Sequence, residues 1–193
     1  MEYVCIPKEY TCMFTPNQLA ILNIFFLHPD SEFYVRELGR ILSKQPGVFQ
    51  KALASLEQNE ILVSKRRGNQ KLFQLNVKYP LLSEVRSIVQ KTSGVEPKLA
   101  AIFRKISGIK LAILFGSYVK GGLKKSSDID LLLVGNPECE DMVLRKLTYI
   151  EKEIMREINY KFYSEAEFRK KEKRDPFILE IISDKYRILK GSI

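Results

Sequence analysis

The residues best suited to chemistry lie in one stretch, "ILFGSYVKGGLKKSSDIDLLLVG", residues 113–135. An apolar run ends at Gly116-Ser117, and a basic loop separates it from a second apolar run that contains Asp128 and Asp130. Side chains at positions i and i+2 of a strand point to the same face, so the two carboxylates are expected to stand side by side. Two neighbouring like charges in a strand that is otherwise apolar are costly unless a cation joins them.

The same stretch offers groups for both a phosphate and a metal ion. Glycine followed by serine, where a strand opens into a helix, presents backbone N–H groups and a hydroxyl to a phosphate. Asp128 and Asp130 would supply the oxygen ligands that Mg²⁺ takes together with substrate phosphates. A P-loop is excluded, because Gly121 is followed by Gly122-Leu123 where that motif requires Lys and then Ser or Thr. The alternative is structural: Ser127 and Asp128 cap a turn, and Asp130 is a polar residue at the edge of a strand.

Composition limits the classes of function. The chain has 193 residues, of which 45% are hydrophobic, enough for one medium domain or two small ones. Its formal net charge of +9 favours an anionic partner such as nucleic acid, nucleotide or an acidic membrane surface. Three widely spaced cysteines without a C-x-x-C pair argue against a disulfide framework and a structural zinc site. With no signal-like start and no apolar run of about 18 residues, we expect a cytoplasmic protein that does not span a membrane.

The amino-terminal half has the pattern of three helices closed by a hairpin. Thr15-Pro16 indicates a helix start, and Pro29-Asp30 ends that helix. A short extended piece "EFYV", a helix "RELGRIL", a turn "SKQPG" and a helix from Val48 to about Asn59 follow. Two β-prone runs then surround Arg67-Gly68-Asn69, a hairpin signal with a basic tip. This order predicts a winged helix-turn-helix.

A winged helix-turn-helix suggests DNA as a partner. In this motif the second helix of the pair enters the major groove and the wing touches phosphate. From Arg36 to Lys71 there are eight basic residues against three acidic ones, which favours DNA over protein contact. The candidate DNA-binding residues are Lys44, Gln45, Gln50, Lys51, Arg66 and Arg67. The alternative is a winged helix used for dimerisation or packing.

The carboxyl-terminal half alternates strands and helices. A helix from Tyr79 to about Thr92 is followed by a break at "SGVEP" and a helix "KLAAIFRKI". The pattern then predicts a strand at Leu111–Phe115, a short helix, a strand at Ile129–Val134, a long helix at Glu138–Glu157, a strand "INYKFYS" and terminal helices. Such an order indicates an α/β unit around a small mixed sheet. We place the domains at residues 1–78 and 98–193, with a connecting helix and linker at 79–97.

The stretch "GSYVKGGLKKSSDIDLLLV" resembles the G-S and D-x-D signature of the polymerase-β-type nucleotidyltransferase superfamily, particularly its minimal members. Three further stretches, "QPGVFQKALASLEQNEIL", "GNQKLFQLNVKYPLLSEVRSIVQKT" and "REINYKFYSEAEF", are similar to a bacterial and archaeal group in which an ArsR/MarR-like winged helix is fused to such a domain. Members of that group are commonly regarded as transcriptional regulators or nucleotidyltransferases. The resemblance implies an α/β (α+β) fold, with a winged helix-turn-helix followed by a nucleotidyltransferase-like domain whose small mixed sheet is flanked by helices.

The resemblance also implies roles for individual residues. Gly116 and Ser117, together with Ser127, would hold the triphosphate. Asp128 and Asp130 would bind the Mg²⁺ or Mn²⁺ pair that activates the attacking hydroxyl and stabilises the leaving pyrophosphate.

Active members of the superfamily generally add a third carboxylate on the next strand, and the matching position here holds Asn159. An amide oxygen can ligate a metal, but it brings no negative charge and cannot act as a base. Glu157, two residues earlier, would share the face of Asn159 on a regular strand and is the alternative third ligand. The departure puts catalysis in doubt more than nucleotide binding.

The sequence therefore predicts a regulator that binds DNA through its winged helix and binds a nucleoside triphosphate with Mg²⁺ through its second domain. The nucleotide would regulate DNA binding. The first alternative is an active nucleotidyltransferase that moves a nucleotidyl group onto a protein or small-molecule hydroxyl. The second is a structural adaptor in which both sites are inactive. We expect a homodimer, since winged helices that read palindromes are usually dimeric.

Overall fold

The structure is a computed structural model that describes residues 13–121 and 127–193. Helices and two small sheets alternate along it, which confirms the predicted α/β (α+β) class. The chain divides into two compact units between Gly94 and Val95. Most of the expected basic loop, residues 122–126, lies outside the described residues. Within the described ranges, no helix is both long and apolar enough to cross a membrane.

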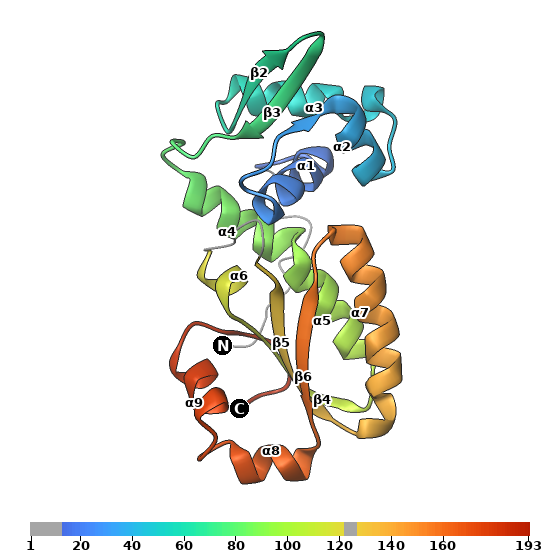
Figure 1. The fold of residues 1–193 in the computed structure, drawn as a ribbon, viewed down its shortest axis with the longest axis vertical. Helices are drawn as coiled ribbons and strands as arrows, with labels where there is room; N and C mark the ends of the chain where they lie inside the picture. Colours follow the sequence, from blue (N-terminus) through green and yellow to red (C-terminus); the bar gives the residue numbers. More distant parts are fainter. Residues whose placement is uncertain (1–12, 122–126) are drawn as a thin grey trace. The chain divides into compact units, whose positions relative to one another are not determined.

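The first unit contains helices α1 to α4 and a three-stranded sheet (Figure 1). Its elements are α1 (Pro16–Leu27), β1 (Phe33–Tyr34), α2 (Val35–Leu42), α3 (Pro46–Gln58), β2 (Leu62–Arg67), β3 (Gln70–Leu75) and α4 (Leu82–Thr92). The strands pair antiparallel in the order β1-β3-β2. Arg67 faces Gln70 across the hairpin, and Gly68 takes the positive φ of 57° that the tight turn requires.

Helix α1 is the centre of the first unit. It begins at a capping box formed by Thr15 and Gln18, with Pro16 in its first turn. It buries side chains all round its circumference, as a helix does when other elements surround it. Helix α3 packs against the same core through Phe49 and Leu56, which leaves its opposite face to solvent.

The second unit is built on a four-stranded sheet in the order β6-β5-β4-β7. Its elements are α5 (Val95–Lys105), β4 (Ile109–Phe115), α6 (Ser117–Lys120), β5 (Ile129–Gly135), the 3₁₀ turn η2 (Pro137–Cys139), α7 (Glu140–Ile154), β6 (Ile158–Tyr163), α8 (Glu165–Lys171), α9 (Pro176–Ser183) and β7 (Arg187–Lys190). Strand β4 runs antiparallel to β5 and β7, whereas β5 and β6 are parallel and are joined by the α7 crossover.

Helices cover both faces of this sheet, with α5 and α7 on one side and α8 and α9 on the other (Figure 1). Leu132 and Val134 of β5 belong to the core that includes Phe168 of α8 and Ile178 of α9. Because strand side chains alternate between faces, every even-numbered position of β5 points toward the α8 and α9 side.

Among the differences from the predicted elements, three have a clear physical reason. Helix α5 begins at Val95, inside the expected break, because Pro97 falls in the first turn, where its missing N–H costs nothing. Helix α7 ends at Ile154, where Met155 turns the chain with a φ of 51°. Strand β7 was not expected at all, since its four residues are too few to show alternation.

Candidate functional site

The two aspartates lie at the start of β5 on one face of the sheet. Asp128 immediately precedes the strand and Asp130 is its second residue, and both are half-buried. By strand alternation they share the face of Leu132 and Val134. Burial and, to a smaller extent, the neighbouring Asp128 charge raise the pKa of Asp130. The two like charges therefore repel one another here, and a bound cation would relieve that repulsion.

Gly116 lies directly against this pair. Phe115 at the end of β4 is the antiparallel partner of Asp130, so the end of β4 meets the start of β5. Gly116 has a φ of 78°, and a Cβ on it would stand 2.3 Å from Oδ2 of Asp130. Only glycine combines this conformation with this approach. Ser117 then opens α6, and Gly116, as the N-cap, has no side chain with which to cap that helix.

Asn159 completes the group from the neighbouring strand. The parallel register pairs it with Asp130, and its Nδ2 donates to Oδ2 of Asp128 at 3.0 Å. Glu157 precedes β6, its side chain is exposed, and its backbone oxygen accepts from the N–H of Ile129 at 3.0 Å. The amide, rather than this carboxylate, makes the contact with the aspartate pair.

The start of β5 is held by a buried arginine that sequence reasoning missed. Arg156 is 7% exposed, and its Nη1 donates to the backbone oxygen of Ser127. Ser127, predicted to contact the nucleotide, therefore takes part through its carbonyl in fixing the segment that carries Asp128. A single arginine between a helix and a strand gives no sequence signal for this contact.

The oxygen ligands of the site suit a hard cation, but they carry little negative charge. In the part of the chain that the structure describes, no cluster of three or more His, Cys, Asp or Glu side chains could hold a metal ion. The site offers two carboxylates and, if the Asn159 amide turns, one neutral oxygen. Such oxygen ligands fit Mg²⁺, which commonly uses one or two carboxylates together with substrate phosphates.

The candidate DNA-binding residues lie on α3, in the turn before it and on β2. Gln45 is the N-cap of α3, and Gln50 and Lys51 are exposed on that helix. Arg66 and Arg67 are exposed at the end of β2, beside the hairpin turn. Lys44, in the turn before α3, is also exposed, and its Nζ donates to Oδ1 of Asn17 at 2.7 Å.

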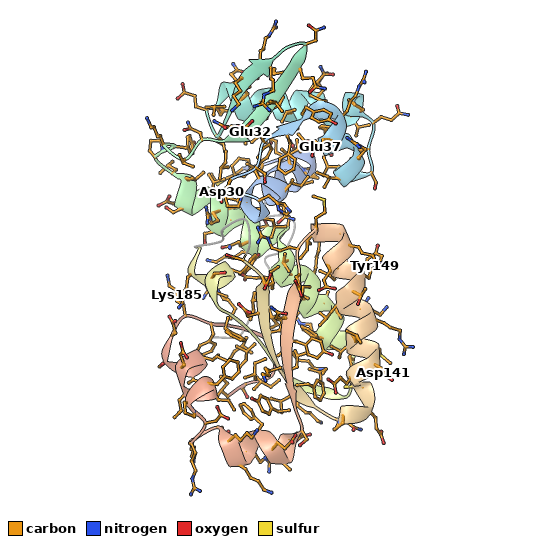
Figure 2. The ribbon with its side chains drawn as sticks, viewed as in Figure 1. Asp30, Glu32, Glu37, Asp141, Tyr149 and Lys185 are labelled. Atoms are coloured by element: carbon orange, nitrogen blue, oxygen red, sulfur yellow. The ribbon has the colours of Figure 1, made fainter. Side chains whose placement is uncertain are left out.

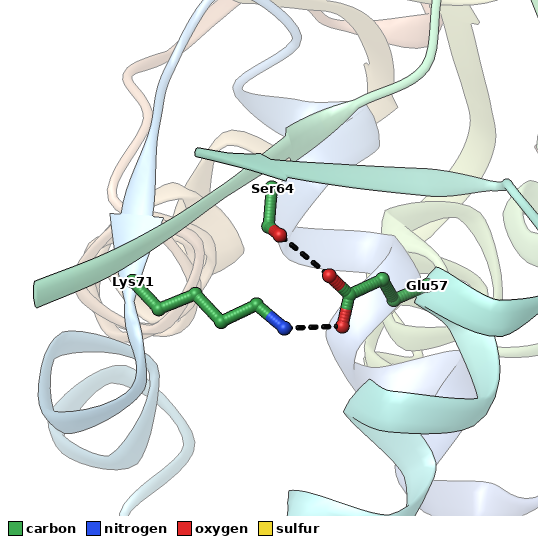
Figure 3. Close-up of polar contacts among 3 residues, drawn as sticks. All are labelled: Glu57, Ser64 and Lys71. Carbon is green, nitrogen blue, oxygen red and sulfur yellow. Dashed lines mark hydrogen bonds and ion pairs between the residues drawn. The ribbon is translucent and has the colours of Figure 1, made fainter. Parts of the chain in front are cut away.

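Acidic side chains already pair with part of the basic surface. Glu57 of α3 accepts hydrogen bonds from Lys71 of β3, at 2.7 Å, and from Ser64 of β2 (Figure 3). The hydrogen bond with Lys71 and, to a smaller extent, the one with Ser64 lower the pKa of the Glu57 carboxyl. Lys65 pairs with Glu32, which Figure 2 labels in this unit. These contacts fix the hairpin to α3 and to the residue that precedes β1. Arg66 and Arg67 follow Lys65 at the end of β2, next to the hairpin turn.

The second unit is similar to a known protein family. Residues 96–189 match the family model of the nucleotidyltransferase domain. The matched range includes Gly116, both aspartates and Asn159, so the group described above lies within the part of the chain that is similar to this family. No curated relative matches the sequence.

Several solved structures are similar to parts of the chain. The MntA-HpeT toxin-antitoxin structure is 16% identical with a TM-score of 0.36, over 50% of this chain and 73% of that one. The adhesin competence repressor AdcR from Streptococcus pyogenes is 18% identical with a TM-score of 0.38, over 52% and 73%. A mutant of ZitR from Lactococcus lactis is 15% identical with a TM-score of 0.36, over 78% and 82%. These scores are too low to carry a conclusion about function.

Proposed function

We propose that the protein is a DNA-binding transcriptional regulator whose nucleotidyltransferase domain binds a nucleoside triphosphate with Mg²⁺, and in which nucleotidyl transfer is weak or lost. The observation that carries the proposal is the group at one end of the second sheet. Asp128 and Asp130 share one face, Gly116 lies against Asp130, and the neutral amide of Asn159 donates to Asp128.

The chain's own residues have distinct roles in this proposal. Asp128 and Asp130 would hold the cation, which supplies charge neutralisation for the phosphates and for the two carboxylates. The backbone at Gly116 lets a phosphate approach closely, and the Ser117 hydroxyl and the N–H groups that open α6 would donate to phosphate oxygens. Arg156 would keep Asp128 in place through the carbonyl that precedes it.

Weak catalysis follows from the amide. Asn159 brings no negative charge for a second metal ion and cannot accept the proton of an attacking hydroxyl. Its Nδ2 stabilises the Asp128 carboxylate in the absence of metal, at 3.0 Å. The site is thus better suited to binding a nucleotide than to transferring one.

Hydrogen bonds that hold the start of α3 in place support the proposal that the first unit binds DNA. The Asn17 side chain of α1 donates to the backbone oxygen of Val48 at 2.8 Å and accepts from Lys44. This contact fixes the first turn of α3, so that Gln50 and Lys51 project from a rigid helix. Gln pairs bidentately with adenine in the major groove, whereas arginines on the hairpin would contact phosphate. We infer binding as a homodimer on a two-fold site.

Active nucleotidyl transfer is the second candidate, because the glycine turn and both aspartates are in place. Incubation with each labelled triphosphate, Mg²⁺ and cell extract separates the two functions. The proposal predicts label that binds the protein reversibly and is transferred to nothing. Label found covalently on a protein or a small-molecule hydroxyl would establish the enzyme instead.

The DNA half of the proposal has its own test. Selection from a random duplex pool should enrich one sequence family, with half-sites related by two-fold symmetry. If no sequence is enriched and no duplex binds at low salt, the DNA half of the proposal fails and the first unit is a protein-contact module.

A further inference from the structure

A cavity of about 160 Å³ lies next to the aspartate pair in the second unit. Phe115, Phe177 and Ile181 form its apolar wall, and Gly116 forms part of its edge. Gly116 is also the residue that lies against Asp130. The cavity and the proposed metal and phosphate site therefore share one residue.

The cavity also opens on the same face of the sheet as the aspartates. Phe115 is the register partner of Asp130 and packs against the core on the α8 and α9 side. Phe177 belongs to the first turn of α9, in that same layer. A ligand with phosphates at Gly116 can thus continue into the cavity without crossing a strand.

The size of the cavity restricts what can enter. Sites that enclose a whole small molecule usually have volumes of about 300 Å³ or more, so this cavity of about 160 Å³ takes only a part of one. Its two phenylalanine rings lie 5.8 Å apart with an interplanar angle of 81°, which offers one face and one edge to a planar group. A flat aromatic ring system is the group that such a wall stabilises best.

The charges around the cavity argue against phosphate as the occupant. Lys120 of α6 forms an ion pair with Asp184, and Glu180 adds a further carboxylate. Lys185, which Figure 2 labels on the segment after α9, supplies a second ammonium group. Two cations and two anions balance, so a polyanion gains little here, whereas a neutral ring with N–H and carbonyl groups finds both acceptors and donors.

We propose that this cavity binds the base of the nucleoside triphosphate, with Phe177 stacking on it. The proposal rests on the proposed function, because it requires the phosphates to lie at Gly116. It assigns α9 to nucleotide recognition and separates base binding, at the cavity, from phosphate binding at Gly116 and metal binding at Asp128 and Asp130.

Titration calorimetry on the full chain tests the assignment with excess Mg²⁺ and five probes: the four common ribonucleoside triphosphates and inorganic tripolyphosphate. Wild-type protein should bind its preferred nucleotide about tenfold or more tightly than tripolyphosphate, the size expected for one base–aromatic contact. Phe177→Leu keeps an apolar side chain but removes the ring. It should weaken nucleotide binding about tenfold and leave tripolyphosphate binding unchanged.

Leu179→Ala is the matched control, because Leu179 lies on the same helix and is 44% exposed. It should change neither affinity, and thermal melting verifies that both variants are folded. Equal wild-type affinity for nucleotide and tripolyphosphate, or an unchanged nucleotide affinity in Phe177→Leu, would overturn the base assignment while leaving the proposed function standing. Equal weakening of both probes by Phe177→Leu would also overturn it. If none of the five probes binds the wild-type protein, the proposed function fails and this inference fails with it.

Discussion

Replacing Asn159 with Asp tests the geometry of the site most sharply, because the side chain is nearly isosteric and only its charge and donor change. In the structure Nδ2 of Asn159 donates to Oδ2 of Asp128 at 3.0 Å. In the variant that contact becomes a close approach of two carboxylates, with Asp130 as a third nearby charge. We expect the variant to be less stable than wild type without metal and to recover when Mg²⁺ is added.

The expected loss of stability is a sum of two effects. Two like charges about 4 Å apart repel by about 1 kcal/mol in water and about 4 kcal/mol near a protein surface. The side chain of Asn159 is exposed and Asp128 is half-buried, so the lower part of that range applies. The lost hydrogen bond to a charged acceptor adds roughly 1 kcal/mol at an exposed position. A total of about 2 kcal/mol follows.

Thermal melting in EDTA and in Mg²⁺ measures this change directly. Each kcal/mol corresponds to about 4–8 °C in the Tm of a domain of roughly 100 residues. Mg²⁺ at about 100 times its Kd would restore about 2.7 kcal/mol. If transfer activity also increases, each tenfold gain corresponds to about 1.4 kcal/mol of barrier.

Asn136→Asp is the matched control, because Asn136 lies beyond the far end of β5. It caps the N–H of Glu138, a bond that Asp can also form, and its Nδ2 donates to Oε2 of Glu138 at 3.1 Å, so the change replaces an amide–carboxylate contact with two carboxylates, as it does at position 159. It adds the same charge away from the site and should gain no stability specific to Mg²⁺. An Asn159→Asp variant that melts like wild type in EDTA, and gains no more from Mg²⁺ than wild type does, would show that Asn159 does not lie with the aspartates. The argument for weakened catalysis would then fail.

Three further changes test other parts of the structure. Arg66→Ala with Arg67→Ala should weaken binding to all duplexes alike and reduce the log–log salt dependence by up to about two units, because hairpin contacts to phosphate carry no sequence information. Glu57→Gln should lower the free energy of unfolding by about 0.5–1 kcal/mol at pH 7; since the pKa of Glu57 is lowered in the fold, the difference should disappear in urea melts as the pH falls from above about 4.3 through the folded pKa. Gly116→Ala places a Cβ 2.3 Å from Oδ2 of Asp130 at a φ of 78°, so it should cost about 1–3 kcal/mol in thermal melts and weaken Mg²⁺-dependent nucleotide binding.

Controls for the DNA experiment come from elsewhere on the chain. Lys170→Ala with Lys173→Ala removes two exposed charges from the second unit and should leave duplex affinity nearly unchanged. Gln50→Ala should alter which sequences are preferred, with a smaller effect on the salt dependence. If the Lys170 and Lys173 pair proves as important as Arg66 and Arg67, DNA does not bind through the hairpin.

The periodic spacing of apolar residues predicts much of the fold. The period-two pattern around Asp128 and Asp130 predicts a strand with both carboxylates on one face, and the structure has that strand at Ile129–Gly135, with Asp128 immediately before it. Pairing is harder to predict, because a shift of one residue reverses every side chain. Whether Glu157 or Asn159 lies beside the aspartates depends on the register in which β6 pairs with β5. The stretch "INYKFYS" alone does not specify that register.

Contacts between distant segments are absent from local patterns for the same reason. Asn17 holds α3 from 31 residues away, and Arg156 holds Ser127 from 29 residues away. The cavity is formed by residues from β4, α6 and α9, and nothing near Phe115 in the sequence indicates that Phe177 will join it. Such features require the folded chain.

The central claim is that the second unit binds a nucleoside triphosphate with Mg²⁺ through its paired aspartates. Titration calorimetry on the full chain, with wild type and the Asp128→Asn and Asp130→Asn double variant, measures it most directly. The account predicts Mg²⁺-dependent binding to wild type, none to the double variant, and a double variant that remains folded because removing the two charges relieves their repulsion. Equal affinity in the two proteins, or wild-type binding that EDTA leaves unchanged, would contradict it.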